Sequence, residues 1–224
     1  MQQYLLQRVS ELVEQRPPDD QELVHFTESL AATVLEDLTG PGDRVLDPFA
    51  GYGTSLVVSR RLGRPSVGVE LLPERVSQVR ARLDALGEGP AAQVVQGDAR
   101  RLADLVEGPF DLCLTSPPYM TANAHPENPL KAYEVPDGDY PTYLEQLGEV
   151  FGQVAGLLRP GGHLALNVAN TVQDGVLTPL AFDLAGVVRR HLTLVQDVVV
   201  CWDGTTWGVG ADFLLVFRRD TTRG

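Results

Sequence analysis

The feature that most constrains the fold is an alternation of two hydrophobic periods that begins at Gly42. Short β-branched runs bounded by Gly or Pro alternate with longer amphipathic stretches, which is typical of a parallel sheet with crossover helices. The expected strands are 44–46, 66–69, 93–95, 112–114, 163–168, 192–202 and 213–217, and the expected helices are 54–62, 73–86, 140–158 and 178–191. The segment 203–210 is too short for a crossover helix, so we expect the last two strands to be antiparallel.

The length of 224 residues suits one domain, because single cores extend to about 250 residues. Before Pro41, apolar positions at helical spacing predict helices over about 3–15 and 27–38. We therefore expect an α/β fold with a seven-stranded, mostly parallel sheet and one antiparallel strand. The expected division is an N-terminal helical extension over 1–40 and a single domain over 41–224.

The composition of the chain argues against polyanions, membranes and metal ions as partners. Lys and Arg number 18 against 30 Asp and Glu, which gives a net charge of −12 that repels polyanions. No apolar run reaches the roughly 18 residues of a membrane span, and no export signal is visible, so we expect a cytoplasmic protein that does not enter a membrane. The two cysteines, Cys113 and Cys201, lie in apolar stretches, and we expect neither a disulfide framework nor a metal site.

A glycine loop follows the first strand of this domain, in the segment 47–55. Gly51 and Gly53 allow a tight turn and a close approach to a ligand at the carboxyl edge of the sheet. Acidic residues end three strands there: Asp47 the first, Glu70 the second and Asp98 the third. Glu70 is placed to accept both hydroxyls of a ribose, and Asp98 to meet an adenine amino group. Together they predict a slot for a nucleoside.

The same loop argues against a phosphate site. Leu56 stands where a dinucleotide fingerprint has its third glycine, and Asp47 would face the phosphates. A P-loop is excluded because the chain has a single lysine, Lys131. The slot therefore suits a neutral or cationic nucleoside.

Ser116-Pro117-Pro118-Tyr119 follows the expected strand 112–114. The prolines hold the chain extended, so the Ser116 hydroxyl and the Pro117 carbonyl can act as adjacent hydrogen-bond acceptors, with an aromatic face at Tyr119. This set can bind a planar group with an exocyclic amine and localise the lone pair of its nitrogen.

In this order, DPFAGYGT (Asp47–Thr54) and TSPPY (Thr115–Tyr119) resemble the S-adenosylmethionine-dependent DNA amino-methyltransferases of the cytosine-N4 and adenine-N6 type, in particular the cytosine-N4 branch. The resemblance covers most of residues 25–218 and implies a Rossmann-like class I methyltransferase fold, S-adenosyl-L-methionine as cofactor, and direct displacement at the methyl group. By position, it assigns the acceptor to Ser116, Pro117, Pro118 and Tyr119. It assigns the cofactor to His25, Thr27, Asp47, Phe49, Ala50, Gly51, Gly53, Thr54, Glu70, Asp98 and Ala99.

The identity of the acceptor stays open. The resemblance favours a cytosine amine in DNA, but the chain has no room for the usual target-recognition segment, and between Ser116 and Leu158 the only lysine or arginine is Lys131. A free nucleoside or heteroaromatic amine, enclosed by the segment 120–138, is the alternative. An RNA base is less favoured, and so is a non-catalytic cofactor-binding subunit, because both sites look intact.

Two histidines and two tryptophans are further candidates for this site. His125 and His163 are expected to be structural rather than catalytic bases. Trp202 and Trp207 could form a further wall of the acceptor site, although tryptophan near a strand end more often packs in a core or rim.

Overall fold

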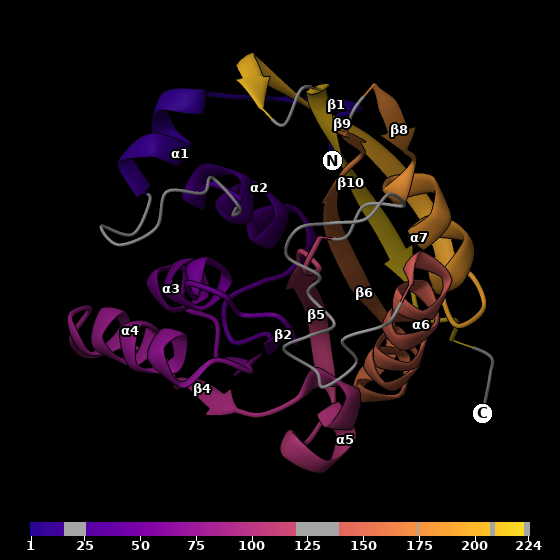
Figure 1. Ribbon diagram of the computed structural model, residues 1–224. Coiled ribbons are helices and arrows are strands. Elements are labelled where there is room, and N and C mark those ends of the chain that lie inside the picture. The colour runs from indigo at the N-terminus through magenta and orange to yellow at the C-terminus, as the bar shows by residue number, and fades with distance from the viewer. Residues whose placement is uncertain (16–25, 120–138, 174, 207–208, 222–224) are drawn as a thin grey trace.

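The computed structural model describes residues 1–15, 26–119, 139–173, 175–206 and 209–221. Its centre is an eight-stranded sheet with the order β1-β9-β10-β6-β5-β2-β3-β4 (Figure 1). The strands are β1 (Tyr4–Gln7), β2 (Val45–Asp47), β3 (Ser66–Glu70), β4 (Ala92–Gln96), β5 (Phe110–Thr115), β6 (Leu158–Ala169), β9 (Thr193–Thr206) and β10 (Val209–Arg218). A separate two-stranded sheet joins β7 (Thr171–Gln173) to β8 (Val176–Thr178).

The strand directions confirm the expected fold class. β10 is antiparallel to both of its neighbours, β6 and β9, and all other neighbouring pairs in the large sheet are parallel. The carboxyl ends of β2 to β6 therefore meet at one edge of the sheet, and β10 begins at this edge. We call it the carboxyl edge.

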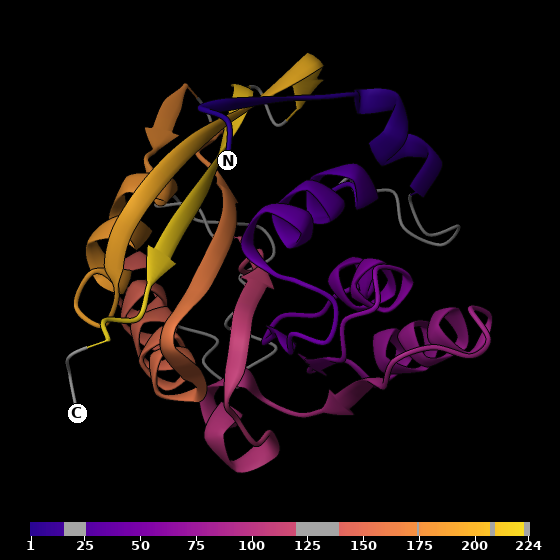
Figure 2. The ribbon, with the colours of Figure 1, turned by 180° about the vertical axis from the view of Figure 1, so that it is seen from behind.

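Helices cover both faces of the sheet (Figures 1 and 2). They are α1 (Val9–Gln15), α2 (Glu28–Leu38), α3 (Thr54–Arg61), α4 (Pro73–Asp84), α5 (Leu102–Leu105), α6 (Tyr140–Leu157) and α7 (Leu180–Val188), with a 3-10 turn, η1, at Ala99–Arg101. Because side chains alternate along a strand, β5 divides its residues between the two layers. Leu112 and Leu114 pack with α2, whereas Cys113 packs with α6 and α7.

The N-terminal segment differs from the expectation. Residues 4–7, expected inside a helix over 3–15, form β1, which pairs in parallel with β9 and makes the sheet eight-stranded rather than seven-stranded. Leu5 and Gln7 are buried while Tyr4 and Leu6 are exposed, which is the alternation of a strand. Pairing with a distant strand overrode the local helical spacing, and the helix begins only at Val9.

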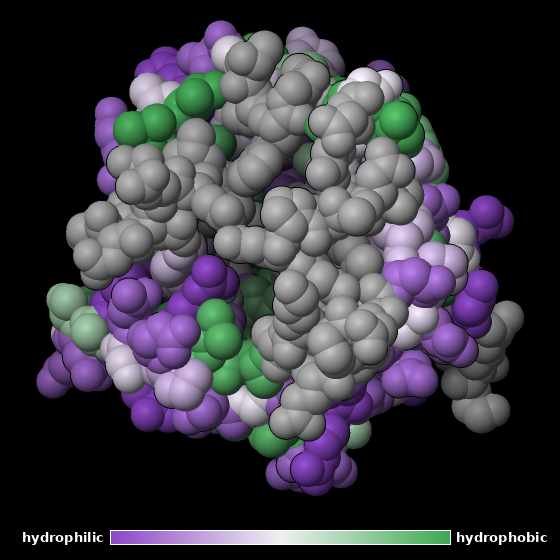
Figure 3. Space-filling view, in the orientation of Figure 1, coloured by the Kyte–Doolittle hydropathy of each residue, from purple (hydrophilic) through white to green (hydrophobic). Residues whose placement is uncertain are grey.

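Residues 1–40 thus supply both an edge strand and α2, whose buried side chains lie against β5, β6, β9 and β10. The division at residue 41 stays a prediction. In the part of the chain that the structure describes, no helix is long and apolar enough to cross a membrane. The space-filling view shows hydrophilic side chains around a small apolar area beside the residues drawn in grey (Figure 3).

Candidate functional site

The glycine loop lies between the end of β2 and the start of α3, at the carboxyl edge. Gly51 and Gly53 have φ values of +51° and +75°, which favour glycine. A Cβ at Gly53 would lie 2.7 Å from Cγ1 of Val79, so a side chain there would be both strained and crowded. The turn is closed by the Gly53 N–H, which donates to the Ala50 carbonyl over 2.7 Å. The loop therefore exposes backbone rather than side chains to any ligand.

Asp47 joins this loop to β5. Its carboxylate is 2% exposed and accepts hydrogen bonds from the Thr115 hydroxyl (2.7 Å), the Phe49 N–H (3.1 Å) and the Ser55 hydroxyl. Burial raises the pKa of Asp47 to about 6, although the hydrogen bonds lower it. The side chain is directed at protein groups, and its expected place beside the methionine part of the cofactor stays a prediction.

Three other residues of the loop segment are packed into the protein. The Phe49 ring lies edge-on to Phe151 of α6, with ring centroids 6.3 Å apart. Ala50 is buried, and its N–H donates to the carbonyl of Val69 on β3 over 2.9 Å. Thr54 is also buried and begins α3. These contacts hold the loop in one conformation on the sheet.

Glu70 ends β3 beside the loop. Its Oε2 accepts the Gly51 N–H and its Oε1 accepts the Leu72 N–H, both over 2.9 Å. Burial raises its pKa. Since a carboxylate oxygen has two lone pairs, each oxygen retains capacity to accept a ribose hydroxyl. These acceptor oxygens therefore fit the ribose hydroxyls of the cofactor, and the ribose role stays a prediction.

Asp98 and Ala99 follow β4 at the same edge. The Asp98 carboxylate caps the short helix η1 by accepting the Arg100 N–H over 2.8 Å. It also pairs with the Arg100 guanidinium, with 2.6 Å from Nη2 to Oδ2. Ala99 is buried. An adenine amino group would therefore have to share Asp98 with Arg100.

The segment before the loop is only partly described, because His25 lies outside the described residues. Thr27 is buried and acts as the N-cap of α2, where its hydroxyl accepts the Leu30 N–H over 3.1 Å. The same hydroxyl donates to Gln7 Oε1, so it links α2 to β1. Contact of Thr27 with the cofactor stays a prediction.

Arg82 is a site residue that the sequence reading missed. From α4 it donates to the Tyr52 carbonyl in the glycine loop and, over 3.2 Å, to Glu28 in the first turn of α2. The side chain therefore connects the loop to α2. Its partners lie 30 and 54 residues away, so no local pattern marks it.

The acceptor segment leaves the end of β5 in an extended path. Ser116 is half-buried and Pro117 is buried. The Pro118 carbonyl accepts the Tyr143 hydroxyl over 2.6 Å, and the Tyr119 hydroxyl accepts the Ala169 N–H over 3.1 Å. Among the described residues, none forms a hydrogen bond with the Ser116 hydroxyl or the Pro117 carbonyl. The Ser116 hydroxyl and the Pro117 carbonyl, which are expected to hold the amine, thus have no protein partner among the described residues.

A second missed residue, Asp212, lies beside this segment. It is 6% exposed and accepts a hydrogen bond from Trp202 Nε1 over 3.0 Å. Burial raises the pKa of Asp212 to about 6. Burial also raises the pKa of Tyr119, and the charge of Asp212 raises it further. The one sequence feature that marks Asp212 is its position as an acidic residue in an otherwise apolar strand.

The other side chains considered for the acceptor site lie away from the carboxyl edge or outside the described residues. His163 pairs with Leu112 near the start of β6, away from the carboxyl edge, and burial lowers its pKa, as do Arg218 and Arg159. His125 and Trp207 lie outside the described residues, as does the segment 120–138.

The sequence is similar to those of known methyltransferases. The family model described as DNA methylase, for N6 and N4 methyltransferases, matches residues 14–81. The chain is 41% identical over 61 residues to the type II methyltransferase M2.DpnII of Streptococcus pneumoniae, a match that covers 27% of this chain and 23% of that protein. It is 32% identical over 184 residues to the release factor glutamine methyltransferase of Rhodospirillum rubrum, over 73% of this chain and 54% of that protein. The match thus spans about half the length of the release factor glutamine methyltransferase and less than a quarter of M2.DpnII.

Solved structures share the fold. TrmN from Thermus thermophilus has a TM-score of 0.65 at 24% identity, covering 87% of this chain and 49% of that chain. Magnesium protoporphyrin IX methyltransferase from Synechocystis PCC 6803, solved with bound S-adenosylmethionine, has a TM-score of 0.59 at 15% identity, covering 86% and 77%. These findings confirm the predicted class I methyltransferase fold. In sequence, the chain is similar to the DNA amino-methyltransferases over residues 14–81 and to a release factor glutamine methyltransferase over 73% of its length.

Proposed function

We propose that the chain transfers a methyl group from S-adenosyl-L-methionine to the exocyclic amine of a planar base. The observation that carries this proposal is the contact between Asp47 and Thr115. It ties the glycine loop directly to the residue before Ser116. This contact would hold a cofactor slot and an amine clamp next to each other at the carboxyl edge.

The cofactor would lie against the backbone of Gly51 and Gly53, where the absence of side chains allows close approach. Glu70 would accept its ribose hydroxyls. Bound adenosylmethionine would supply a methyl group on a positively charged sulfur, so that the C–S bond breaks as the C–N bond forms. The protein's own contribution would be alignment of the two reactants.

The amine would be held by the Ser116 hydroxyl and the Pro117 carbonyl, each accepting one N–H hydrogen. This turns the nitrogen lone pair away from the ring and toward the methyl group. Tyr119, fixed through Ala169, would stack on the ring of the acceptor. After transfer, the extra proton on nitrogen would pass to water.

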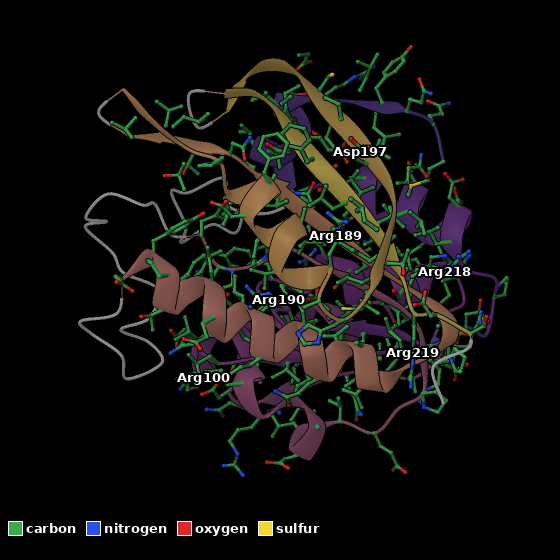
Figure 4. All side chains as sticks on the ribbon, turned by 90° about the vertical axis from the view of Figure 1, so that its right-hand side faces the viewer. Arg100, Arg189, Arg190, Asp197, Arg218 and Arg219 are labelled. Atoms are coloured by element: carbon green, nitrogen blue, oxygen red, sulfur yellow. The ribbon has the colours of Figure 1, made fainter. Side chains whose placement is uncertain are left out.

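Arg82 and Arg100 lie at the carboxyl edge, where they contact Tyr52 and Asp98, whereas four other arginines lie away from it. Arg189, Arg190, Arg218 and Arg219 lie on the flank formed by the end of α7 and the end of β10 (Figure 4). Arg218 is in register with His163 at the start of β6, which is the edge opposite to Ser116. The family resemblance favours a cytosine amine in DNA. The net charge of −12, and the presence of one lysine and no arginine between Ser116 and Leu158, favour a nucleoside or other small heteroaromatic amine.

A primary amide is a second candidate acceptor. The relative from Rhodospirillum rubrum is named as a glutamine methyltransferase, and the planar NH₂ group of glutamine presents the same two hydrogens to a clamp of two acceptors.

The test is a transfer assay with methyl-labelled adenosylmethionine. Parallel reactions contain duplex DNA, single-stranded DNA, RNA, free nucleosides and a glutamine-containing peptide, all at low salt. Label on an exocyclic amine supports the proposal, and the acceptor that takes it decides among DNA, RNA and small molecules. Label only on the peptide favours the amide alternative. Cofactor binding without label on any acceptor contradicts the proposal.

A further inference from the structure

The Tyr143 hydroxyl is a donor from α6 that holds the backbone of the acceptor segment. Tyr143 lies near the start of α6 and is 1% exposed. Its hydroxyl donates to the Pro118 carbonyl over 2.6 Å, within the usual range for an O–H···O hydrogen bond. Because water has little access to this side chain, few other groups compete for the hydroxyl, and the contact holds the Pro118 carbonyl in one direction.

The position of the Tyr143 ring is set by the core around it. The ring belongs to the apolar cluster between the sheet and the helices α6 and α7, which lie on one face of the sheet (Figure 1). Leu147 and Phe151 of α6 are members of the same cluster. The Tyr143 N–H donates to the Asp139 carbonyl over 3.0 Å, so the backbone is held as well. A side chain packed in this way keeps one rotamer, and the hydroxyl therefore has a fixed place from which to hold Pro118.

The hydrogen bond to Pro118 controls the one backbone angle that this residue has free. The pyrrolidine ring fixes φ of Pro118 at about −65°, and peptide planarity fixes ω. The remaining angle, ψ, sets the direction of the Pro118 carbonyl, which is the group that Tyr143 holds. Since ψ of Pro118 also orients the next residue, a fixed carbonyl fixes the backbone of Tyr119 relative to Pro117.

The other groups of the segment do not supply this constraint. Pro117 and Pro118 have no N–H, so the backbone of these two residues can be held only through carbonyl oxygens. The Tyr119 hydroxyl accepts the Ala169 N–H over 3.1 Å, which holds the far end of that side chain but not the backbone at its base. Loss of the Tyr143 hydroxyl would therefore leave Tyr119 tethered at its tip and free to tilt.

We propose that Tyr143 is a positioning residue for methyl transfer. Its hydroxyl sets the angle between the Pro117 carbonyl, which accepts the amine of the acceptor, and Tyr119, which stacks on the acceptor ring. Tyr143 acts through Pro118 and is assigned no contact with either reactant. This inference rests on the proposed function and adds to it a side chain from α6.

Tyr140 offers a matched control on the same helix. Its ring stacks on that of Tyr143, with centroids 5.9 Å apart and an angle of 26° between the rings. Its hydroxyl donates instead to Oδ2 of Asp183 on α7, over 2.8 Å. Replacement of either tyrosine by phenylalanine thus removes one hydrogen-bonded hydroxyl from the same pair of rings. Of the two variants, Tyr143→Phe is the one that removes the contact with the acceptor segment.

The first measurement is the single-turnover rate of methyl transfer by the full chain, per cofactor-binding site, with saturating adenosylmethionine. The acceptor is duplex DNA, RNA, a free nucleoside or the glutamine-containing peptide, whichever the wild type labels fastest. Tyr143→Phe should lower the rate by about 10-fold, because a displacement of about 1 Å can cost up to about 100-fold. The dissociation constant for adenosylmethionine should stay within about twofold, and Tyr140→Phe should keep both values. A rate in Tyr143→Phe no lower than in Tyr140→Phe overturns the inference, and so does an equal loss of rate and cofactor affinity, which a purely structural role would give.

The second measurement needs no methyl transfer. The ring signals of Tyr119 are recorded by NMR in the full chain with 13C-labelled tyrosine and bound S-adenosylhomocysteine, and are identified by their loss in Tyr119→Phe. They should shift or broaden in Tyr143→Phe and stay in place in Tyr140→Phe, and unchanged signals in Tyr143→Phe overturn the inference. A wild type that labels no exocyclic amine, with displaced Tyr119 signals in Tyr143→Phe, contradicts the proposed function alone. Transfer to an amine that Tyr143→Phe leaves unchanged contradicts the inference alone.

Discussion

The Thr115 hydroxyl donates a hydrogen bond to Asp47 Oδ1 over 2.7 Å, which joins the ends of two neighbouring strands, β5 and β2. One strand leads into the glycine loop and the other into Ser116. Because both groups are buried, the contact is shielded from competing water. It therefore fixes the distance between the two halves of the proposed site.

Replacing Thr115 by Val should weaken this connection. The substitution keeps the shape but removes a donor from a buried carboxylate, so we expect the free energy of unfolding to fall by about 1–3 kcal/mol. The initial rate of methyl transfer should fall by about tenfold or more, because a reactant held in the wrong position reacts more slowly. Urea denaturation and initial rates measure the two effects. Thr33→Val, which removes an exposed hydroxyl on α2, is the control, and equal effects of both variants would refute the role of the contact.

Asp47 should make stability depend on pH. Its pKa is raised from 3.8 to about 6, so the folded state binds the proton more tightly than the unfolded state does. The contribution of Asp47 to the free energy of unfolding therefore falls as pH rises from about 4 to about 6, by at most about 3 kcal/mol. The neighbouring titratable groups are Glu70 and Cys113.

Denaturation of wild type and Asp47→Asn across this pH range measures the difference. The variant should lose the part of the slope due to Asp47 and keep the part due to Asp212, whose pKa is also about 6. Parallel curves for the two proteins would show that burial does not raise the pKa of Asp47.

The parts of the site that could be predicted are those whose chemistry is local. Gly53 is required by its backbone angle and by Val79, and the Ser116-Pro117-Pro118-Tyr119 segment carries its acceptors in consecutive residues. The parallel sheet was predictable for the same reason, because hydrophobic periods within single segments indicate it.

The missed features depend on contacts across the chain. β1 is a strand because Tyr4 lies beside Val199, a partner at the far end of the sequence. Arg82 and Asp212 acquire their places through Tyr52 and through Trp202. Local spacing carries no information about such pairings, so the helical spacing of residues 3–15 misled the prediction.

Glu70 should act mainly on cofactor affinity. Glu70→Gln keeps the length of the side chain but replaces one acceptor oxygen by an amide NH₂. The variant should therefore lose the Gly51 contact or the Leu72 contact, together with one acceptor for a ribose hydroxyl. We expect the dissociation constant for adenosylmethionine to rise by about 10-fold or more. Isothermal calorimetry measures it, with the exposed Glu74→Gln in α4 as control. Unchanged affinity in Glu70→Gln would remove the ribose assignment.

Ser116 should act on the transfer step rather than on the cofactor. Ser116→Ala removes one of the two acceptors for the amine but leaves the Pro117 carbonyl, so kcat should fall by about 10- to 100-fold. Affinity for adenosylmethionine should stay within about twofold, because the glycine loop and Glu70 are untouched. Ser77→Ala, which removes an exposed hydroxyl in α4, is the control. An equal loss of rate and cofactor affinity in Ser116→Ala would instead place Ser116 in folding or in cofactor binding, since a group that contacts only the acceptor cannot change both.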